Sequence, residues 1–200
     1  MAMSEGCTEA DVSDALTAGA PSRRLVVLVN GLPAAGKTTL ARALSRRLSL
    51  PLLSKDVIKE AQADIFGTQP PDERPQRAWN SQFGAAANAT MWALLADSPS
   101  GAVLESTWPG QETWGFVQAG LSAAEVTAPR QIWCEVPLAV ARERFAARHP
   151  ARHAIHGEPP DDEEWSGRWA LATPLPIPDT LHVETTGPVD LNTITTWCLK

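Results

Sequence analysis

The chain has 200 residues, 44% of them hydrophobic, and its net charge of −6 gives an isoelectric point of about 5.2. This length fits one domain with a full hydrophobic core. The acidic balance argues against nucleic acid as a partner, because nucleic-acid-binding surfaces are usually basic. Three cysteines without metal-ligand spacing, no signal-peptide pattern and no apolar run of about 18 residues predict a cytoplasmic protein without a membrane span.

Predicted strands alternate with predicted helices along the chain. Residues 1–22 are acidic and poor in apolar side chains, so we expect a disordered tail followed by a single domain over 23–200. Apolar runs predict strands at 25–29, 52–53, 102–104, 131–136 and 180–184. Periodic or capped segments predict helices at 37–48, 57–65, 76–96, 111–123, 138–148, from about 161, and at 189–198. This alternation predicts an α/β fold, a five-stranded parallel sheet with helices on both faces.

The first strand and the first helix are joined by a complete phosphate-loop motif, G-x-x-x-x-G-K-T, at residues 31–38. Backbone N–H groups of such a loop converge on a phosphate, the lysine reaches the β- and γ-phosphates, and the threonine hydroxyl ligates Mg²⁺. We expect ATP to be bound by Gly31, Ala34, Ala35, Gly36, Lys37, Thr38 and Thr39. The motif predicts a P-loop NTPase but does not identify the reaction, because P-loops occur in kinases and ATPases alike.

Asp56 follows the second predicted strand, at the edge of the sheet where ligands bind in α/β folds. A carboxylate at this point can accept the proton of an acceptor hydroxyl, as a kinase base does. The alternative is that Asp56 caps the helix that begins there.

Four stretches, 30–41, 53–56, 144–153 and 183–186, resemble the small P-loop kinases that include chloramphenicol phosphotransferase and the zeta-toxin kinases. The resemblance implies ATP as the phosphate donor, Asp56 as general base, an arginine-rich lid at about 144–160, and adenine bound near 185–188. It also implies phosphorylation of a hydroxyl on a small molecule, such as an antibiotic or a sugar nucleotide.

Glu105 ends the third predicted strand, where many P-loop proteins carry an aspartate that holds Mg²⁺. Here the residue is glutamate and Ser106 follows it, whereas the antibiotic kinases that the chain resembles have an acidic pair. This difference favours contact of Glu105 with the substrate over direct ligation of the metal, and a structural role is the third alternative.

Arg144, Arg148 and Arg152 are spaced four residues apart, so the first two share a helix face. We expect Arg144 and Arg148 to contact the nucleotide, and Arg148 and Arg152 to neutralise the transferring phosphoryl group. The alternative is a solvated basic face paired with Glu143 or the acids at 161–164. The histidines of this segment, 149, 153 and 156, are interpreted as solvated loop residues or, alternatively, as lid or substrate contacts, because Pro150 argues against a helical zinc site.

The segment 67–118 is expected to form the acceptor pocket, with Trp79, Gln82 and Trp108 in contact with the substrate. Core packing is the alternative for tryptophans, of which the chain has eight. The sequence thus predicts an ATP-dependent kinase of a small-molecule hydroxyl. A toxin-like kinase of a sugar nucleotide and a regulatory ATPase module remain as alternatives, and the sequence does not predict an oligomeric state.

Overall fold

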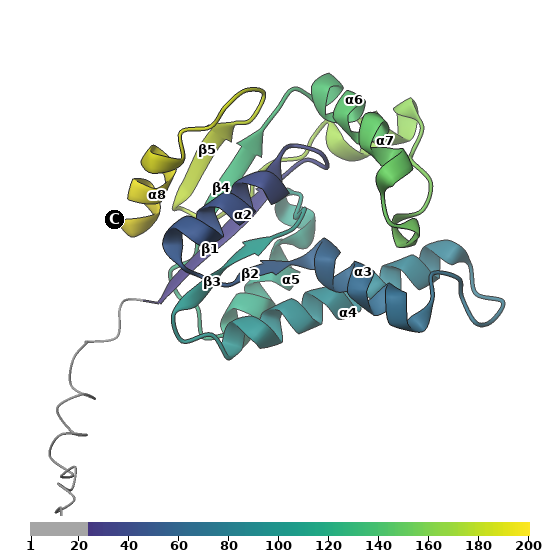
Figure 1. The fold of residues 1–200 in the computed structure, drawn as a ribbon, viewed down its shortest axis with the longest axis horizontal. Helices are drawn as coiled ribbons and strands as arrows, with labels where there is room; N and C mark the ends of the chain where they lie inside the picture. The colour runs from purple at the N-terminus through teal and green to yellow at the C-terminus, as the bar shows by residue number, and fades with distance from the viewer. Residues whose placement is uncertain (1–23) are drawn as a thin grey trace, which may run out of the picture.

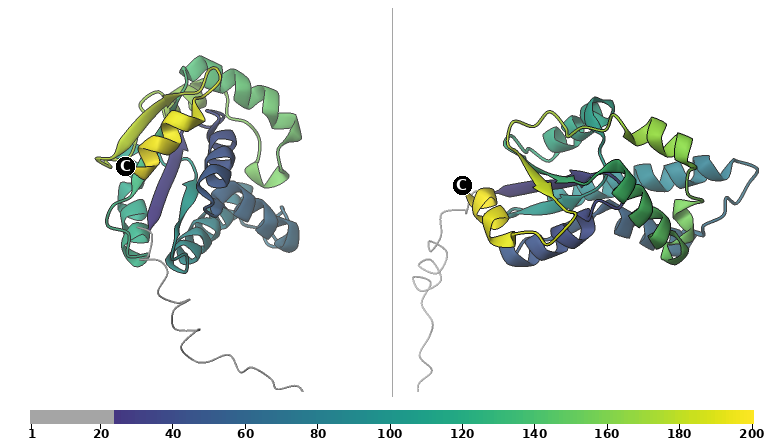
Figure 2. Two further views of the ribbon diagram at one scale, coloured as in Figure 1. Left: turned by 60° about the vertical axis from the view of Figure 1, so that its left-hand side comes forward. Right: turned by 90° about the horizontal axis from the view of Figure 1, so that it is seen from above.

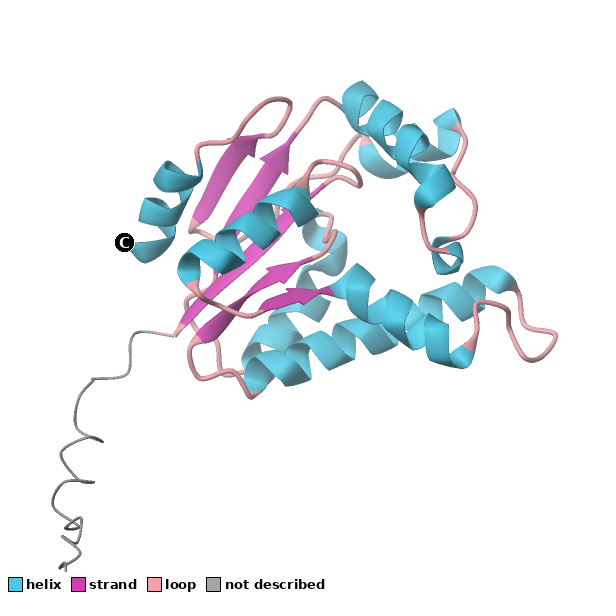
Figure 3. Cartoon of the chain, in the orientation of Figure 1, coloured by secondary structure: helices cyan, strands magenta, loops and turns pink. Residues whose placement is uncertain are grey.

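The computed structural model describes residues 24–200, and the expected tail at 1–22 lies outside this range. Five strands, β1 (Leu25–Gly31), β2 (Leu52–Ser54), β3 (Gly101–Glu105), β4 (Arg130–Glu135) and β5 (Thr180–Glu184), form one parallel sheet in the order β2-β3-β1-β4-β5 (Figure 3). This arrangement confirms the predicted fold class. None of the helices between residues 24 and 200 is both long and apolar enough to cross a membrane.

Helices cover both faces of the sheet (Figures 1 and 2). One face packs against α2 (Lys37–Leu48) and α8 (Leu191–Leu199), and the other against α4 (Gln76–Ala96) and α5 (Gly110–Ala123). The central strand β1 is buried on both faces because its successive side chains enter the two opposite core clusters: Val27 and Val29 enter one, and Val26 and Leu28 enter the other.

The remaining helices lie at the carboxyl end of the strands, where they surround a cavity. The helix α3 (Lys55–Phe66) continues directly from β2, and α6 (Leu138–Arg148) follows β4. Beyond α6, the predicted loop contains two short 3₁₀ helices, η1 (His149–Ala151) and η2 (Ala154–His156). Then α7 (Asp162–Trp169) begins at Asp161, whose carboxylate accepts a hydrogen bond from the Glu164 N–H at 2.8 Å.

The register of the sheet brings the functional segments level with one another. Val29 of β1 lies beside Glu105 of β3, and Ser54 of β2 lies on the other side of Glu105. The phosphate loop after β1 and the start of α3 therefore emerge at the same edge of the sheet.

Candidate active site

The phosphate loop begins with Gly31 at the end of β1 and closes with Gly36, the residue that precedes α2. A Cβ on Gly31 would lie 2.7 Å from the carbonyl oxygen of Cys134, so the loop passes too close to β4 for any side chain here. Gly36 adopts a left-handed conformation with φ 84° and no side chain caps the start of α2. The first N–H groups of α2 are thus left for an anion, which the positive end of the helix also favours.

Lys37 extends from the first turn of α2 and is 6% exposed. Its ammonium donates a hydrogen bond to the carbonyl oxygen of Leu32 at 2.7 Å, which holds the side chain across the loop. Burial lowers the pKa of Lys37, while the nearby carboxylate of Glu105 opposes this effect. A buried cation at this point is well placed for the β- and γ-phosphates of a nucleotide.

Glu105 lies between Thr38 and Ser54 and is 4% exposed. Its Oε1 accepts a hydrogen bond from the Thr38 hydroxyl at 3.2 Å, and its Oε2 accepts one from the Ser54 hydroxyl at 2.6 Å. Hydroxyl and carboxylate oxygens are the ligands that Mg²⁺ prefers, so these side chains fit a magnesium ion. Because both oxygens of Glu105 already face these hydroxyls, the geometry favours the metal over the expected substrate contact.

A cavity of about 840 Å³ opens above these residues at the carboxyl end of the strands. Most of the expected site residues line it: Ala34, Gly36, Lys37, Thr38, Thr39, Asp56, Glu105, Arg144, Arg148 and Arg152. Two others support the loop from behind. Gly31 packs against β4, and Ala35 is fully buried with its carbonyl oxygen accepting a hydrogen bond from the Thr185 hydroxyl at 2.7 Å.

Asp56 lies in the first turn of α3, and the residue that precedes the helix is Ser54, so the helix-cap alternative is wrong. The Asp56 carboxylate lies 3.9 Å from the Lys55 ammonium and 3.8 Å from the Arg152 guanidinium. Burial acts to raise the pKa of Asp56, but the charges of Lys55, His156, Arg152 and Lys37 outweigh it and lower that pKa. The carboxylate is therefore ionised at neutral pH and faces the same cavity as Lys37.

The arginines of the predicted lid divide into two groups. Arg144 donates hydrogen bonds to the carbonyl oxygens of Thr185 and Thr186, at 2.9 and 3.0 Å, and so ties α6 to the loop expected to hold adenine. Arg148 and Arg152 flank the ring of Phe145, with their guanidinium carbons 6.0 and 5.1 Å from its centroid. The alternative pairing with the acids at 161–164 is instead made by Arg142, which contacts Asp162 at 2.9 Å.

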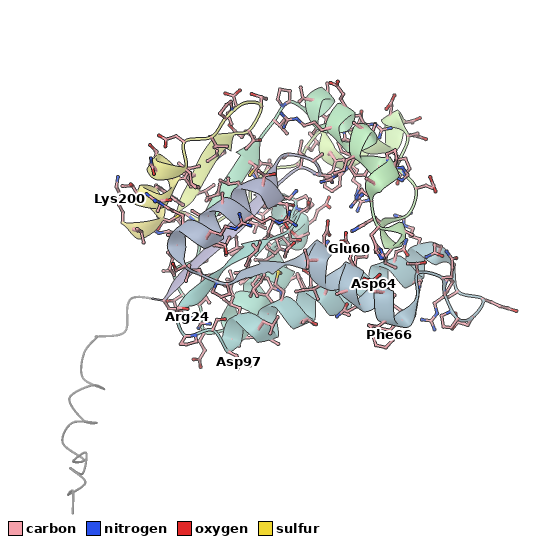
Figure 4. All side chains as sticks on the ribbon, viewed as in Figure 1. Arg24, Glu60, Asp64, Phe66, Asp97 and Lys200 are labelled. Atoms are coloured by element: carbon pink, nitrogen blue, oxygen red, sulfur yellow. The ribbon has the colours of Figure 1, made fainter. Side chains whose placement is uncertain are left out.

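Two of the lid histidines contact carboxylates of α3, Glu60 and Asp64, which are labelled in Figure 4. His156 lies 2.6 Å from a carboxylate oxygen of Glu60, and His153 lies 3.1 Å from one of Asp64. His149 lies 3.3 Å from the carbonyl oxygen of Gly157, within the lid itself. Over residues 24–200, no group of three or more histidine, cysteine or acidic residues is arranged to hold a metal ion.

Three residues expected in the acceptor pocket lie elsewhere. Trp108 is 2% exposed and stacks on Trp92, with ring centroids 6.1 Å apart, so it belongs to the hydrophobic core. Trp79 packs edge-on against Phe83 at 4.9 Å, in a cluster beneath α3. Gln82 is exposed and accepts a hydrogen bond from Arg74. None of the three lines the cavity that contains the phosphate-loop residues, so the structure gives their expected substrate contact no support.

The rest of the cavity wall includes residues that, His156 apart, the sequence analysis did not select. The α5 start contributes Pro109, Glu112 and Thr113, and the remainder comes from α3, the lid and α7: Lys55, Lys59, His156, Glu158, Pro159, Pro160, Glu164, Trp165, Arg168 and Trp169. One available signal was the spacing of Lys55 and Lys59, which places both on the helix face next to Asp56. The approach of α7 depends on tertiary packing and has no comparable signal.

The chain is similar to known proteins in sequence and in fold. Residues 26–163 match the family described as AAA domain. A protein from Chloroflexus aurantiacus, described as a kinase on a provisional basis, has 31% identity and a TM-score of 0.74 over 88% of this chain and 97% of its own. No curated protein matches the chain.

Two more distant structures share the fold alone. A gluconokinase from Sinorhizobium meliloti has 15% identity and a TM-score of 0.56, over 88% of this chain and 90% of its own. The APS kinase of Mycobacterium tuberculosis, in complex with AMPPNP and APS, has 15% identity and a TM-score of 0.57, over 90% of this chain and 100% of its own. The chain therefore has the fold of P-loop kinases.

Proposed function

This chain belongs to the AAA domain family, and we propose that it transfers the γ-phosphate of ATP to a hydroxyl of a small molecule. The observation that carries the proposal is that one cavity contains both the phosphate-loop residues and an ionised carboxylate, Asp56. An ATPase that only hydrolyses nucleotide requires no enclosed acceptor space beside such a carboxylate. The regulatory-module alternative is therefore less well supported.

In the proposed reaction, Asp56 accepts the proton of the acceptor hydroxyl. The hydroxyl oxygen forms a bond to the γ-phosphorus while the bond from that phosphorus to the bridging oxygen breaks, and ADP leaves. Lys37 stabilises the charge on the β- and γ-phosphates. Arg148 and Arg152 are proposed to stabilise the transferring group from the lid side, and Arg144 positions α6.

Magnesium would be held by Thr38 and Glu105, with Glu105 acting directly or through water. Held there, the ion would offset the negative charge of the triphosphate. Ser54 has a positioning role in this proposal, because its hydroxyl donates to one Glu105 oxygen and fixes the carboxylate next to Thr38.

The resemblance to the zeta-toxin and chloramphenicol phosphotransferase group leaves antibiotics and sugar nucleotides as acceptor classes. Tryptophans do not dominate the cavity, because Trp165 and Trp169 line it whereas Trp79 and Trp108 do not. Lysine, arginine and acidic side chains account for much of its wall instead. A polar acceptor therefore fits better.

The test is to incubate the protein with Mg²⁺-ATP and a panel of hydroxylated antibiotics, sugar nucleotides, sugars and hydroxy acids, and to search by mass spectrometry for products that gain one phosphate. We expect a product with the wild type that Asp56→Asn reduces by about 10²-fold or more. Steady ATP hydrolysis with no phosphorylated product from any acceptor would contradict the proposal. An undiminished product with Asp56→Asn would remove the base role.

A further inference from the structure

Lys59 is a nearly buried cation in the cavity wall without a partner of its own. It is 9% exposed and lines the cavity from α3, one turn beyond Asp56. In the part of the chain that the structure describes, its ammonium makes no hydrogen bond or ion pair. Burying a charge without a partner is costly, and methionine or leucine would fill the same volume without this cost.

The carboxylates near Lys59 already contact other side chains: two cations at Asp56, and at Glu60 the imidazole of His156, whose pKa is lowered by burial. Asp56 lies between Lys55 and Arg152, at 3.9 and 3.8 Å. Glu60, the next residue along α3, contacts His156 at 2.6 Å. The positive charge of Lys59 is therefore left over after the local ion pairs are made.

The wider cavity has the same imbalance. Lysine and arginine side chains outnumber aspartate and glutamate in its lining, although the chain as a whole has a net charge of −6. Lys37, Arg144 and Arg148 lie with the phosphate loop and α6, where a nucleotide would use them. Lys55 and Lys59 come from α3 on either side of Asp56, the residue proposed to contact the acceptor hydroxyl, so the triphosphate does not account for them.

We propose that Lys59 binds an anionic group of the acceptor, so that the substrate is a small hydroxylated oxyanion, either a carboxylate or a phosphate ester. This inference rests on the proposed function, since it assigns the acceptor of that reaction. Side chains three or four residues apart on a helix have Cβ atoms about 5–6 Å apart. With the hydroxyl at Asp56 and the anion at Lys59, the two groups of the acceptor are separated by a few carbon atoms.

The experiment compares matched acceptors that differ only in charge. The panel contains sugar acids with their uncharged sugars, and sugar phosphates with the same sugars, each assayed with Mg²⁺-ATP. We expect the acidic members to be phosphorylated in preference, and Lys59→Met to raise their KM by about 10- to 100-fold with a smaller effect on kcat. Lys59→Arg should restore much of the affinity, and Lys200→Met, at the exposed C-terminus, is the matched control. The carboxylate and phosphate arms identify the preferred oxyanion.

A binding measurement keeps the inference separate from catalysis. Inorganic sulfate is titrated against the protein with Mg²⁺-AMPPNP, which occupies the phosphate loop, and the unfolding temperature is recorded. We expect sulfate to raise this temperature for the wild type but not for Lys59→Met. An equal rise in both proteins, or a preference for uncharged acceptors, would overturn the inference while leaving phosphotransfer intact. Failure of all acceptors would instead contradict the proposed function, and the sulfate titration would still decide the role of Lys59.

Discussion

The two halves of the cavity are made in different ways. The phosphate half comes from one continuous stretch, residues 31–39, and much of its binding capacity is backbone N–H at the start of α2. The acceptor half is assembled from side chains of α3, α5, α7 and the lid, which are distant in sequence. Backbone N–H groups continue to bind phosphate when neighbouring side chains are substituted. A binding site made of side chains changes its ligand preference when those side chains are substituted. In the proposed function, the first half binds the phosphate donor, and the second half supplies the base and determines which acceptor is used.

The largest effect is expected in the phosphate half. Lys37→Met should lower kcat/KM for ATP at least about 10³-fold, because it removes the buried cation that offsets charge on the transferring phosphate. The Lys37→Met variant should remain folded, because methionine fills a volume similar to that of lysine without the cost of a buried charge. Nucleotide turnover and circular dichroism check both points, with Lys200→Met as control. Near-normal turnover in Lys37→Met would break the assignment of this half.

In the acceptor half, Asp56→Asn should lower kcat about 10²–10³-fold while leaving the affinity for ATP nearly unchanged. The reason is that the amide cannot accept the hydroxyl proton. Nucleotide binding by calorimetry and turnover with a saturating acceptor separate these quantities. Asp64→Asn is a matched control on the same helix, because Asp64 contacts His153 and does not line the cavity. Equal losses in the two variants would contradict a base role.

Glu105→Gln tests the boundary between the halves. We expect the Mg²⁺ concentration for half-maximal activity to rise about 10- to 100-fold, because the carboxylate next to Thr38 loses its charge. The acceptor KM should change little. A magnesium titration at saturating acceptor checks this, with Glu143→Gln on α6 as control. A raised acceptor KM with unchanged magnesium dependence would return Glu105 to a substrate role.

Replacing Lys59 is expected to raise the free energy of unfolding while it lowers the affinity for an anionic acceptor. Burial, together with the charges of Lys55 and Arg152, lowers the pKa of Lys59 to about 8 against the opposing charges of Asp56 and Glu60. A folded-state pKa below the unfolded value means that the protonated lysine destabilises the fold below pH 8, and that this penalty fades as pH rises toward 10.5. Lys59→Met should therefore raise the free energy of unfolding at pH 7 by roughly 1–3 kcal/mol.

Denaturant unfolding at pH 7 and pH 10 measures this difference, which should shrink at the higher pH. In the wild type, the KM for an anionic acceptor should be flat below pH 8 and rise above it, as Lys59 loses its proton. In Lys59→Arg the rise should be absent, because arginine stays charged. A loss of stability in Lys59→Met would indicate a structural role for the lysine.

The smallest effect is expected outside the cavity. Gln82→Ala should leave kcat and the acceptor KM within about twofold, because the side chain is exposed and contacts only Arg74. Acceptor kinetics check this, and a large rise in the acceptor KM would place α4 back in the binding site.

The difference between the halves also explains what the sequence could predict. The strand pattern and the phosphate loop are local features, so the sheet, its order of elements and the nucleotide side followed from short stretches such as 25–38. Asp56 was found because it lies immediately after a strand. The contribution of α7 could not be predicted, because it depends on how residues 162–169 pack against Phe145 and the phosphate loop.

The tryptophans show the limit of composition. Trp108 appeared suited to a pocket, but Asn30 binds its backbone N–H and carbonyl oxygen at 2.9 and 2.8 Å, and the ring turns into the core. Trp165 and Trp169, which had no special sequence context, lie in the cavity wall instead. The two hydrogen bonds from Asn30, 78 residues earlier in the chain, orient the Trp108 backbone so that its ring enters the core.

The most direct test of the central claim is the rate of ADP formation with and without an acceptor, measured together with the mass of the product. We predict slow ADP formation from Mg²⁺-ATP alone, a large increase on adding a hydroxylated acid, and one phosphorylated acceptor for each ADP. ADP formation at the same rate in both conditions, with the phosphate released as inorganic phosphate and no phosphorylated acceptor, would show an ATPase and contradict the account.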